Sequence, residues 1–280
     1  MVHIITDTTS ALSPKIAAHY DIPVIPQIIH FGEESFHEGI DIDNQEFMRR
    51  LQEGDVHPKT AAPEPELFIE QFERLTTDGE PILCIHPSTE VSGTVRSATI
   101  AAQEFPGADI RVIDTRLIAS PLGTLVKLAA QWAKEGGDAD TIEARIQDMA
   151  PHCHIYFLVA TLEYLARGGR IGGAARLLGS ALNLKPLLTI EDGRVEVLEK
   201  IRSRGKAIQR MLKLAEETLD GQRPVAAGII DVDAANVAEE VTAEVMKRLK
   251  PKQFYRTAVT PVVGGHAGPG TIGLGFYTEV

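Results

Sequence analysis

Cysteine is scarce in this chain: among its 280 residues only Cys84 and Cys153 are cysteines, and both lie in apolar stretches far apart. Two separated thiols give no disulfide framework and are typical of a reducing compartment. The opening segment MVHIITD lacks the basic region and the long apolar region of a secretion signal. No run approaches the roughly 18 apolar residues expected of a membrane span. These absences predict a cytoplasmic protein that does not insert stably into a membrane.

A dense run of lysine and arginine is also absent. The chain carries 28 basic and 39 acidic residues, a formal net charge of -11, and its sequence pI is about 5.3. Such a surface repels nucleic-acid phosphates unless basic residues are segregated into a patch. With 44% apolar and 24% charged residues, the composition is that of a globular protein able to bury a substantial core. The sequence therefore predicts no nucleic-acid partner.

The first half of the chain alternates short apolar segments with longer amphipathic ones. In the amphipathic segment 64–75, for example, Phe68, Phe72 and Leu75 share one helical face. Strands that alternate with helices favour a parallel sheet covered by helices, so we predict an N-terminal α/β domain of this kind over residues 1–151. Its strands are predicted over 2–6, 22–31, 81–85 and 110–113, and its helices over 44–52, 64–75, 95–105, 117–134 and 139–149.

The pattern changes in the second half. The Asp192-Gly193 pair between two apolar segments predicts a β-hairpin. Strands and helices here favour a mixed sheet with helices on one face, and thus a C-terminal mixed α/β domain over residues 152–280. Its strands are predicted over 155–160, 184–190, 195–201, 225–230, 254–259 and 274–277, and its helical segments over 162–167, 173–180, 203–219 and 234–249.

A glycine-rich stretch, GGHAGPGTIG over residues 264–273, contains a literal match to the dinucleotide-binding pattern G-x-G-x-x-G. That fingerprint must follow a strand and open a helix within a βαβ unit of roughly 30 residues. Only residues 274–280 remain after the match, so a nucleotide site is not predicted. We expect a glycine loop there instead, in which His266 is a candidate hydrogen-bond donor to a carboxylate or phosphate.

Two polar loops, over residues 7–10 and 88–94, follow predicted strands of the first half. Open α/β sheets bind their ligands at this edge, although a serine there can equally be a helix cap. Ser92 is followed by Gly93 at the start of a predicted helix, a position suited to binding an anion. In the second half, Arg170 beside Gly169 is the obvious charged contact for an anion.

Ser92 and His266 together also raise the hypothesis of a serine hydrolase that acts on acyl esters. The segment 90–94 lacks the G-x-S-x-G pattern, but a catalytic triad is recognised by geometry, so the sequence leaves this alternative open. A structural or regulatory protein that only keeps the fold is a third hypothesis.

Other motifs that would carry chemistry are missing. The G-x-x-x-x-G-K-[ST] pattern of an ATPase does not occur. His152 and His154 share a strand face without a second ligand pair at zinc-like spacing, so no metal site is predicted. Asp43 is expected to cap the helix that begins at residue 44 rather than to bind a metal with Asp41.

Taken together, short motifs along the whole chain resemble those of the DegV family of bacterial fatty-acid-binding proteins. No single motif is specific, but their order and spacing are. The matching pieces are ITDTTS at 5–10, GIDID at 39–43, KT at 59–60 with Pro63, VSGT at 91–94, LEYL at 162–165, GGRI at 168–171, LKP at 184–186, IR at 201–202, and His266 with GPG at 268–270. The resemblance implies a two-domain DegV-like fold with a long-chain fatty acid held between the domains.

The same resemblance implies roles for individual residues. Thr60, Ser92 and His266 fall on the positions that bind the fatty-acid carboxylate, and Arg170 falls near the headgroup, where the family works with its kinase partner. That partner is a separate ATP-binding fatty-acid kinase subunit, which converts the presented carboxylate to an acyl phosphate for phospholipid metabolism. The implied protein is a lipid-binding subunit with no catalytic residue, cofactor or metal of its own.

Overall fold

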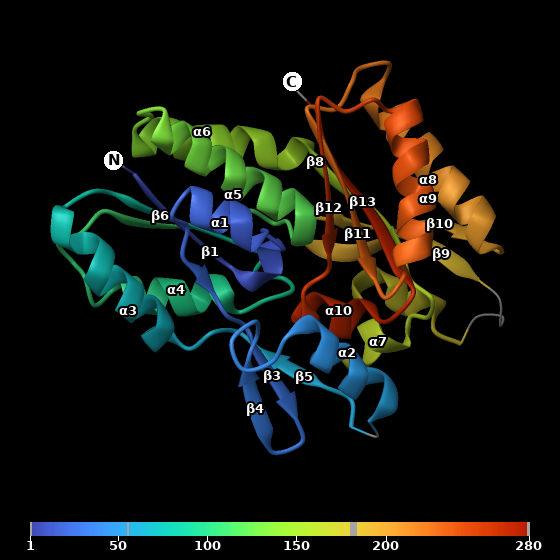
Figure 1. The fold of residues 1–280 in the computed structure, drawn as a ribbon, viewed down its shortest axis with the longest axis horizontal. Helices are drawn as coiled ribbons and strands as arrows, with labels where there is room; N and C mark the ends of the chain where they lie inside the picture. Colours follow the sequence, from blue (N-terminus) through green and yellow to red (C-terminus); the bar gives the residue numbers. More distant parts are fainter. Residues whose placement is uncertain (1, 55, 180–183, 279–280) are drawn as a thin grey trace. The chain divides into compact units, whose positions relative to one another are not determined.

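The computed structural model describes residues 2–54, 56–179 and 184–278, which form two compact units. The first unit comprises Met1–Pro151 together with Thr260–Val262, and the second comprises His152–Val259 together with Val263–Val280. Each unit has its own main sheet (Figure 1). Each also has its own hydrophobic core.

A four-stranded parallel sheet forms the centre of the first unit. Its strands lie in the order β2 (Val24–Ile25), β1 (His3–Asp7), β6 (Ile82–His86) and β7 (Ile110–Asp114). The helix-covered parallel sheet predicted for this half is therefore confirmed. One face packs on α3 (Pro65–Leu75) and α4 (Thr94–Ala102), where the fully buried side chains include Ile5, Ile82, Cys84, Phe68, Phe72 and Ala98.

Two further helices cover this sheet on its other side, as Figure 1 shows. They are α5 (Ala119–Lys134), which contacts β1 and β6, and α6 (Ala139–Met149), which contacts β6. The apolar character of α5 follows from its position, because 11 of its 16 residues are buried. Neither helix, nor any other in the part of the chain that the structure describes, is long and apolar enough to cross a membrane.

A small antiparallel sheet in the first unit was not predicted. It consists of β4 (Glu34–His37), β3 (Ile28–Phe31) and β5 (Lys59–Ala61). The helix α2 (Asn44–Glu53) lies between β4 and β5 in the sequence. The extended segment predicted over 22–31 is thus two strands, which Pro26 and Gln27 separate. A short helix, α1 (Pro14–His19), was also missed, since its six residues are too few to show a helical period. The predicted Asp43 cap of α2 is confirmed: its carboxylate accepts from Glu46 N at 2.8 Å.

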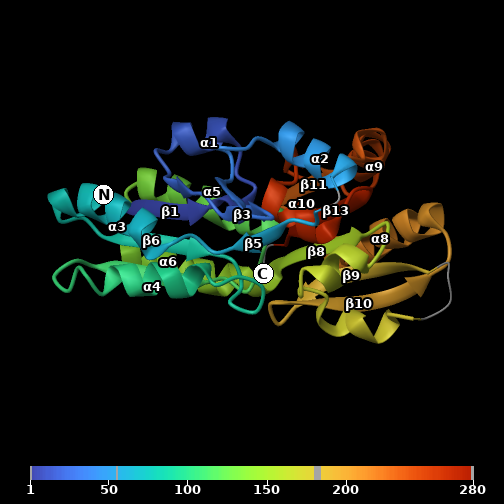
Figure 2. The same ribbon diagram turned by 90° about the horizontal axis from the view of Figure 1, so that it is seen from below.

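The second unit contains a six-stranded mixed sheet, as predicted. Its order is β10 (Arg194–Ile201), β9 (Lys185–Glu191), β8 (Cys153–Leu158), β13 (Thr271–Tyr277), β11 (Ala226–Val232) and β12 (Gln253–Ala258), and only the β11–β12 pair is parallel. Figure 2 shows β9 and β10 side by side as the predicted hairpin. Asp192 and Gly193 at its turn both have positive φ, +49° and +78°. A two-residue hairpin turn of type I′ requires positive φ at both of its central residues.

Helices α8 (Arg204–Leu219) and α9 (Ala235–Arg248) pack on this sheet and complete the core of the second unit. Met211 and Leu212 of α8, and Val245 of α9, are fully buried there. The short helix α7 (Glu163–Arg167) agrees with the predicted segment 162–167. The predicted segment 173–180 is a 3-10 helix over Gly172–Leu177, and its last residue lies outside the described residues.

The prediction of a glycine loop over 264–273 is wrong. Residues Pro261–Ala267 form a helix, α10, and β13 begins at Thr271 rather than at Leu274. The turn between them contains the two glycines of this stretch with positive φ, Gly268 at +79° and Gly270 at +84°. The G-P-G-T-I-G match is therefore a turn that leads from a helix into a strand, which is the reverse of the order in a dinucleotide site.

Candidate functional site

Polar side chains gather where β1 and β6 end in the first unit. Asp7 is the last residue of β1 and His86 the last of β6, and both are fully buried. His86 Nδ1 lies 2.8 Å from Asp7 Oδ2, while Asp7 Oδ1 accepts from the Thr9 amide at 2.9 Å and from the Thr9 hydroxyl at 2.6 Å. A buried carboxylate needs donors of this kind, because unpaired burial of its charge is costly.

This cluster continues by hydrogen bonds to Ser92. Gln27 Nε2 donates to Asp7 Oδ1 at 2.9 Å and to Thr94 Oγ1 at 2.8 Å. Thr94 Oγ1 in turn lies 2.7 Å from Ser92 Oγ, and the Thr94 amide donates to Ser92 Oγ at 3.3 Å. The two strand-end loops predicted to form a ligand edge are thus connected. Gln27 was missed, and its only signal is a polar side chain inside an apolar extended segment.

Thr60 belongs to the same unit as Ser92. It lies on the edge strand β5, opposite Ile29 of β3, and its side chain is half-buried. A Cβ added to Gly93 would come within 3.3 Å of the Ala62 Cβ. The segment that follows Thr60 therefore lies against the turn that carries Ser92, and the first unit brings these two predicted site segments together.

His266 and Arg170 lie close to one residue of the second unit, Gly168. The His266 imidazole, on α10, packs so closely on Gly168 that an added Cβ there would lie 2.7 Å from Cε1 and nearer still to Nδ1. Arg170 Nη1 donates to the Gly168 carbonyl at 2.8 Å. Glycine at position 168 leaves the space that the His266 ring occupies. Imidazole and guanidinium are thus held beside the same peptide.

A buried carboxylate that the sequence analysis missed is Glu38. It is 3% exposed, and its Oε1 accepts from the Val262 amide in the first turn of α10 at 2.6 Å. Burial raises the pKa of Glu38 to about 7, against the hydrogen bonds from Thr8 and from the Val262 amide, which lower it. The Glu38 amide also donates to the Gln27 carbonyl at 2.9 Å. No local sequence pattern marks this residue, since its partner lies 224 residues away.

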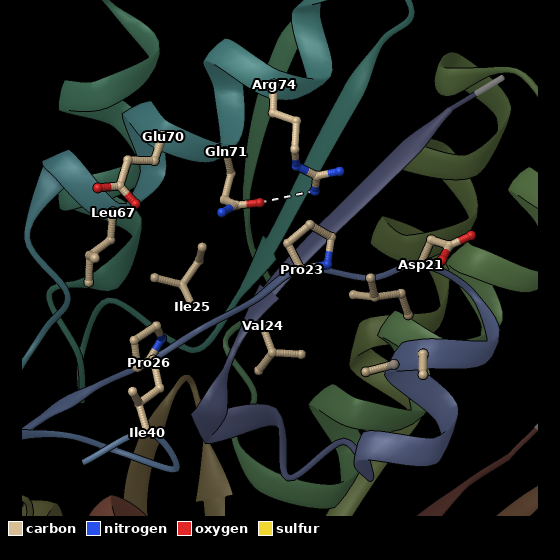
Figure 3. A pocket seen from close by; sticks show the side chains of 13 residues that line it. Asp21, Pro23, Val24, Ile25, Pro26, Ile40, Leu67, Glu70, Gln71 and Arg74 are labelled. Carbon is tan, nitrogen blue, oxygen red and sulfur yellow. Dashed lines mark hydrogen bonds between the residues drawn. The ribbon is translucent and has the colours of Figure 1, made fainter.

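The first unit also contains a pocket of about 430 Å³ between β2 and α3 (Figure 3). Its walls are largely apolar and include Val24, Ile25 and Leu67, while Arg74 is hydrogen-bonded to Gln71 at 3.0 Å near its rim. Thr60 and Ser92 are not among its lining residues. This pocket is therefore separate from the polar network at the strand ends.

The geometry gives no support to the serine-hydrolase alternative. Within the described residues of the first unit, the Ser92 hydroxyl forms its hydrogen bonds with Thr94. His86, the histidine of the network, faces Asp7 and packs edge-on against the Phe68 ring, 5.3 Å away. No group of three histidine, cysteine, aspartate or glutamate side chains among the described residues could hold a metal ion.

These features define a two-unit α/β protein with a buried polar network at the strand ends of its parallel sheet. The chain belongs to the DegV family, as the sequence motifs predicted: the family model described as "Uncharacterised protein, DegV family" matches residues 1–279. A DegV domain-containing protein of Streptomyces coelicolor is 37% identical over 276 residues, which cover 98% of this chain and 97% of the relative.

Solved structures show the same similarity. A DegV family protein from Thermus thermophilus, described for its fatty-acid binding, superposes with a TM-score of 0.94 at 32% identity and covers 99% of both chains. A stearic-acid-binding protein from Eubacterium ventriosum superposes with a TM-score of 0.91 at 26% identity, over 99% of this chain and 98% of that one. The predicted DegV-like fold is confirmed.

Proposed function

We propose that this protein binds a long-chain fatty acid and holds its carboxylate with Thr60, Ser92 and His266. The observation that carries the proposal is the similarity, over nearly the full length of the chain, to a DegV protein described for its fatty-acid binding. Thr60 and Ser92 belong to the first unit and His266 to the second.

The chemistry of these side chains suits the proposed ligand. A carboxylate that leaves water must be paired with hydrogen-bond donors, or its pKa rises until it becomes the neutral acid. Two hydroxyls and an imidazole can supply those donors. The acyl chain then contributes most of the affinity, at about 0.8 kcal/mol for each CH₂ group that it buries.

The first test is the lipid itself. Protein purified from cells is expected to release a fatty acid when it is denatured and extracted for mass spectrometry. Added acids of about 14 to 18 carbons are expected to raise the melting temperature, because a ligand that binds only the folded state stabilises it. Protein that carries no lipid and gains no stability from these acids would contradict the proposal.

Replacement of His266 by alanine is expected to weaken fatty-acid binding about tenfold, because one hydrogen bond to a charged group is lost. Displacement of a fluorescent fatty acid measures this affinity. His19→Ala is a matched control, since His19 is an exposed histidine on α1 that belongs to neither group of site residues. Equal affinities of His266→Ala and of the unchanged protein would remove His266 from the proposed site.

We further propose that the protein acts in the cytoplasm and presents the bound carboxylate to a separate ATP-binding kinase subunit. Family resemblance and the absence of a G-x-x-x-x-G-K-[ST] motif support this step. We propose that Arg170 takes part in presenting the carboxylate to the kinase subunit.

Replacement of Arg170 by alanine is expected to leave fatty-acid affinity within about twofold and to lower acyl-phosphate formation by the added kinase subunit several-fold, since one cationic contact is worth roughly 1 kcal/mol or more. Arg167→Ala, which removes an exposed arginine on α7, is the control. A kinase rate that Arg170→Ala leaves unchanged would refute the proposed role.

A further inference from the structure

The orientation of the Gln27 side-chain amide follows from its neighbours. Gln27 is 2% exposed, and one of its amide heavy atoms lies 2.9 Å from Asp7 Oδ1. That oxygen already accepts from the Thr9 amide and hydroxyl, so the atom facing it must be the NH₂ group, which donates. The same nitrogen has a second hydrogen, and Thr94 Oγ1, 2.8 Å away, accepts it.

The direction of the next hydrogen bond then follows. Thr94 is fully buried, so its hydroxyl proton needs an acceptor inside the protein. In the part of the chain that the structure describes, the hydrogen-bond partners of Thr94 Oγ1 are Gln27 Nε2 and Ser92 Oγ. Gln27 Nε2 is a donor, and thus Ser92 Oγ is the oxygen that receives the Thr94 proton.

The Ser92 hydroxyl is left with one role. Its oxygen accepts from the Thr94 hydroxyl at 2.7 Å and from the Thr94 amide at 3.3 Å, which occupies both lone pairs. The proton of this half-buried hydroxyl therefore points away from Thr94 and can only donate. A ligand atom placed there must be an acceptor. An ionised carboxylate only accepts, whereas an alcohol headgroup has a proton of its own to place.

We infer that Gln27 and Thr94 are positioning residues, which fix the Ser92 hydroxyl as a donor and so make the site prefer a carboxylate to an alcohol headgroup on the same acyl chain. The inference rests on the proposed fatty-acid function. Neither residue is proposed to touch the ligand, because both orient the Ser92 hydroxyl that does.

The test compares two ligands on the full-length protein: tetradecanoic acid and 1-tetradecanol, each measured by displacement of a fluorescent fatty acid at a pH where the acid is ionised. Thr94→Val keeps the side-chain shape and removes the hydroxyl, and Thr94→Ser keeps the hydroxyl. For Thr94→Val we expect affinity for the acid to fall about tenfold and affinity for the alcohol to change less than about twofold. Thr94→Ser is expected to restore the preference for the acid.

The other possible results separate failure of the positioning role from failure of the proposed function. Equal weakening of both ligands, or no change in either, would overturn the positioning role and leave the proposed function standing. The same holds if the unchanged protein binds acid and alcohol equally. An unchanged protein that binds neither ligand refutes the proposed function together with this inference. If Thr94→Val does not fold, Gln27→Met decides, because it removes the donor that orients Thr94 and should lower the same acid-to-alcohol ratio.

Discussion

Replacement of Gly168 by alanine is expected to destabilise the protein by about 1–3 kcal/mol and to weaken fatty-acid binding at the same time. The cause is local overpacking, because the new methyl group would lie 2.7 Å from His266 Cε1 and closer to Nδ1. Backbone strain contributes nothing, since Gly168 has φ of -77°, which alanine adopts readily. Either the imidazole leaves its position or α10 shifts, and both displace a proposed carboxylate contact. Urea unfolding and ligand displacement measure the two effects.

A double-mutant cycle shows whether the imidazole is the cause. In a His266→Ala background the new methyl group meets no ring, so Gly168→Ala should cost less than about 0.5 kcal/mol, and the difference is the coupling energy. Gly107→Ala serves as the control for glycine replacement itself, because a Cβ at the exposed Gly107 would meet no atom within 4 Å. The same cost with and without the imidazole would contradict the packing that brings Gly168 and His266 together.

The parallel sheet of the first unit and the six-stranded sheet of the second could be predicted because their strands carry local signals. Apolar segments such as 81–85 are flanked by amphipathic helices, and the Asp192-Gly193 pair favours a hairpin. The helix α10 could not be predicted in this way, because glycine at 264 and 265 disfavours a helix. A long-range contact and a local one stabilise it instead: the distant Glu38 carboxylate accepts from its first turn, and the Thr271 hydroxyl donates to the Ala267 carbonyl at its end.

Some residues of the candidate site could likewise be predicted from the sequence, and others could not. The loops that carry Asp7 and Ser92 were placed at one edge of the sheet because parallel strands end side by side. Gln27 and Glu38 were missed because each acts through partners that no local pattern reveals. Gln27 donates to Asp7, 20 residues away in the sequence, and to Thr94, 67 residues away. A buried polar side chain is informative only once its partners are known, and sequence spacing does not supply them.

The stability of the protein is expected to contain a pH-dependent contribution from Glu38 that increases as the pH falls. Its pKa is about 7 in the folded state, against 4.5 for an unperturbed glutamate. Between these values the folded state keeps a proton that the unfolded chain has lost, so lower pH favours folding. The contribution is complete below pH 4.5 and is lost as the pH rises through 7. From about pH 8 to about pH 5.5 it should amount to about 2 kcal/mol.

Glu38→Gln isolates this contribution, because glutamine has nearly the same shape, keeps an oxygen for the Val262 amide and does not titrate. Urea unfolding of both proteins at several pH values gives the difference in free energy, in which the other titrating groups cancel. We expect the glutamate form to gain on the glutamine form as the pH falls through 7. Glu33→Gln, at an exposed position, should show a constant difference. Parallel pH profiles for the unchanged protein and Glu38→Gln would mean that Glu38 is already ionised when folded, and that the α10 amide and the Thr8 hydroxyl outweigh its burial.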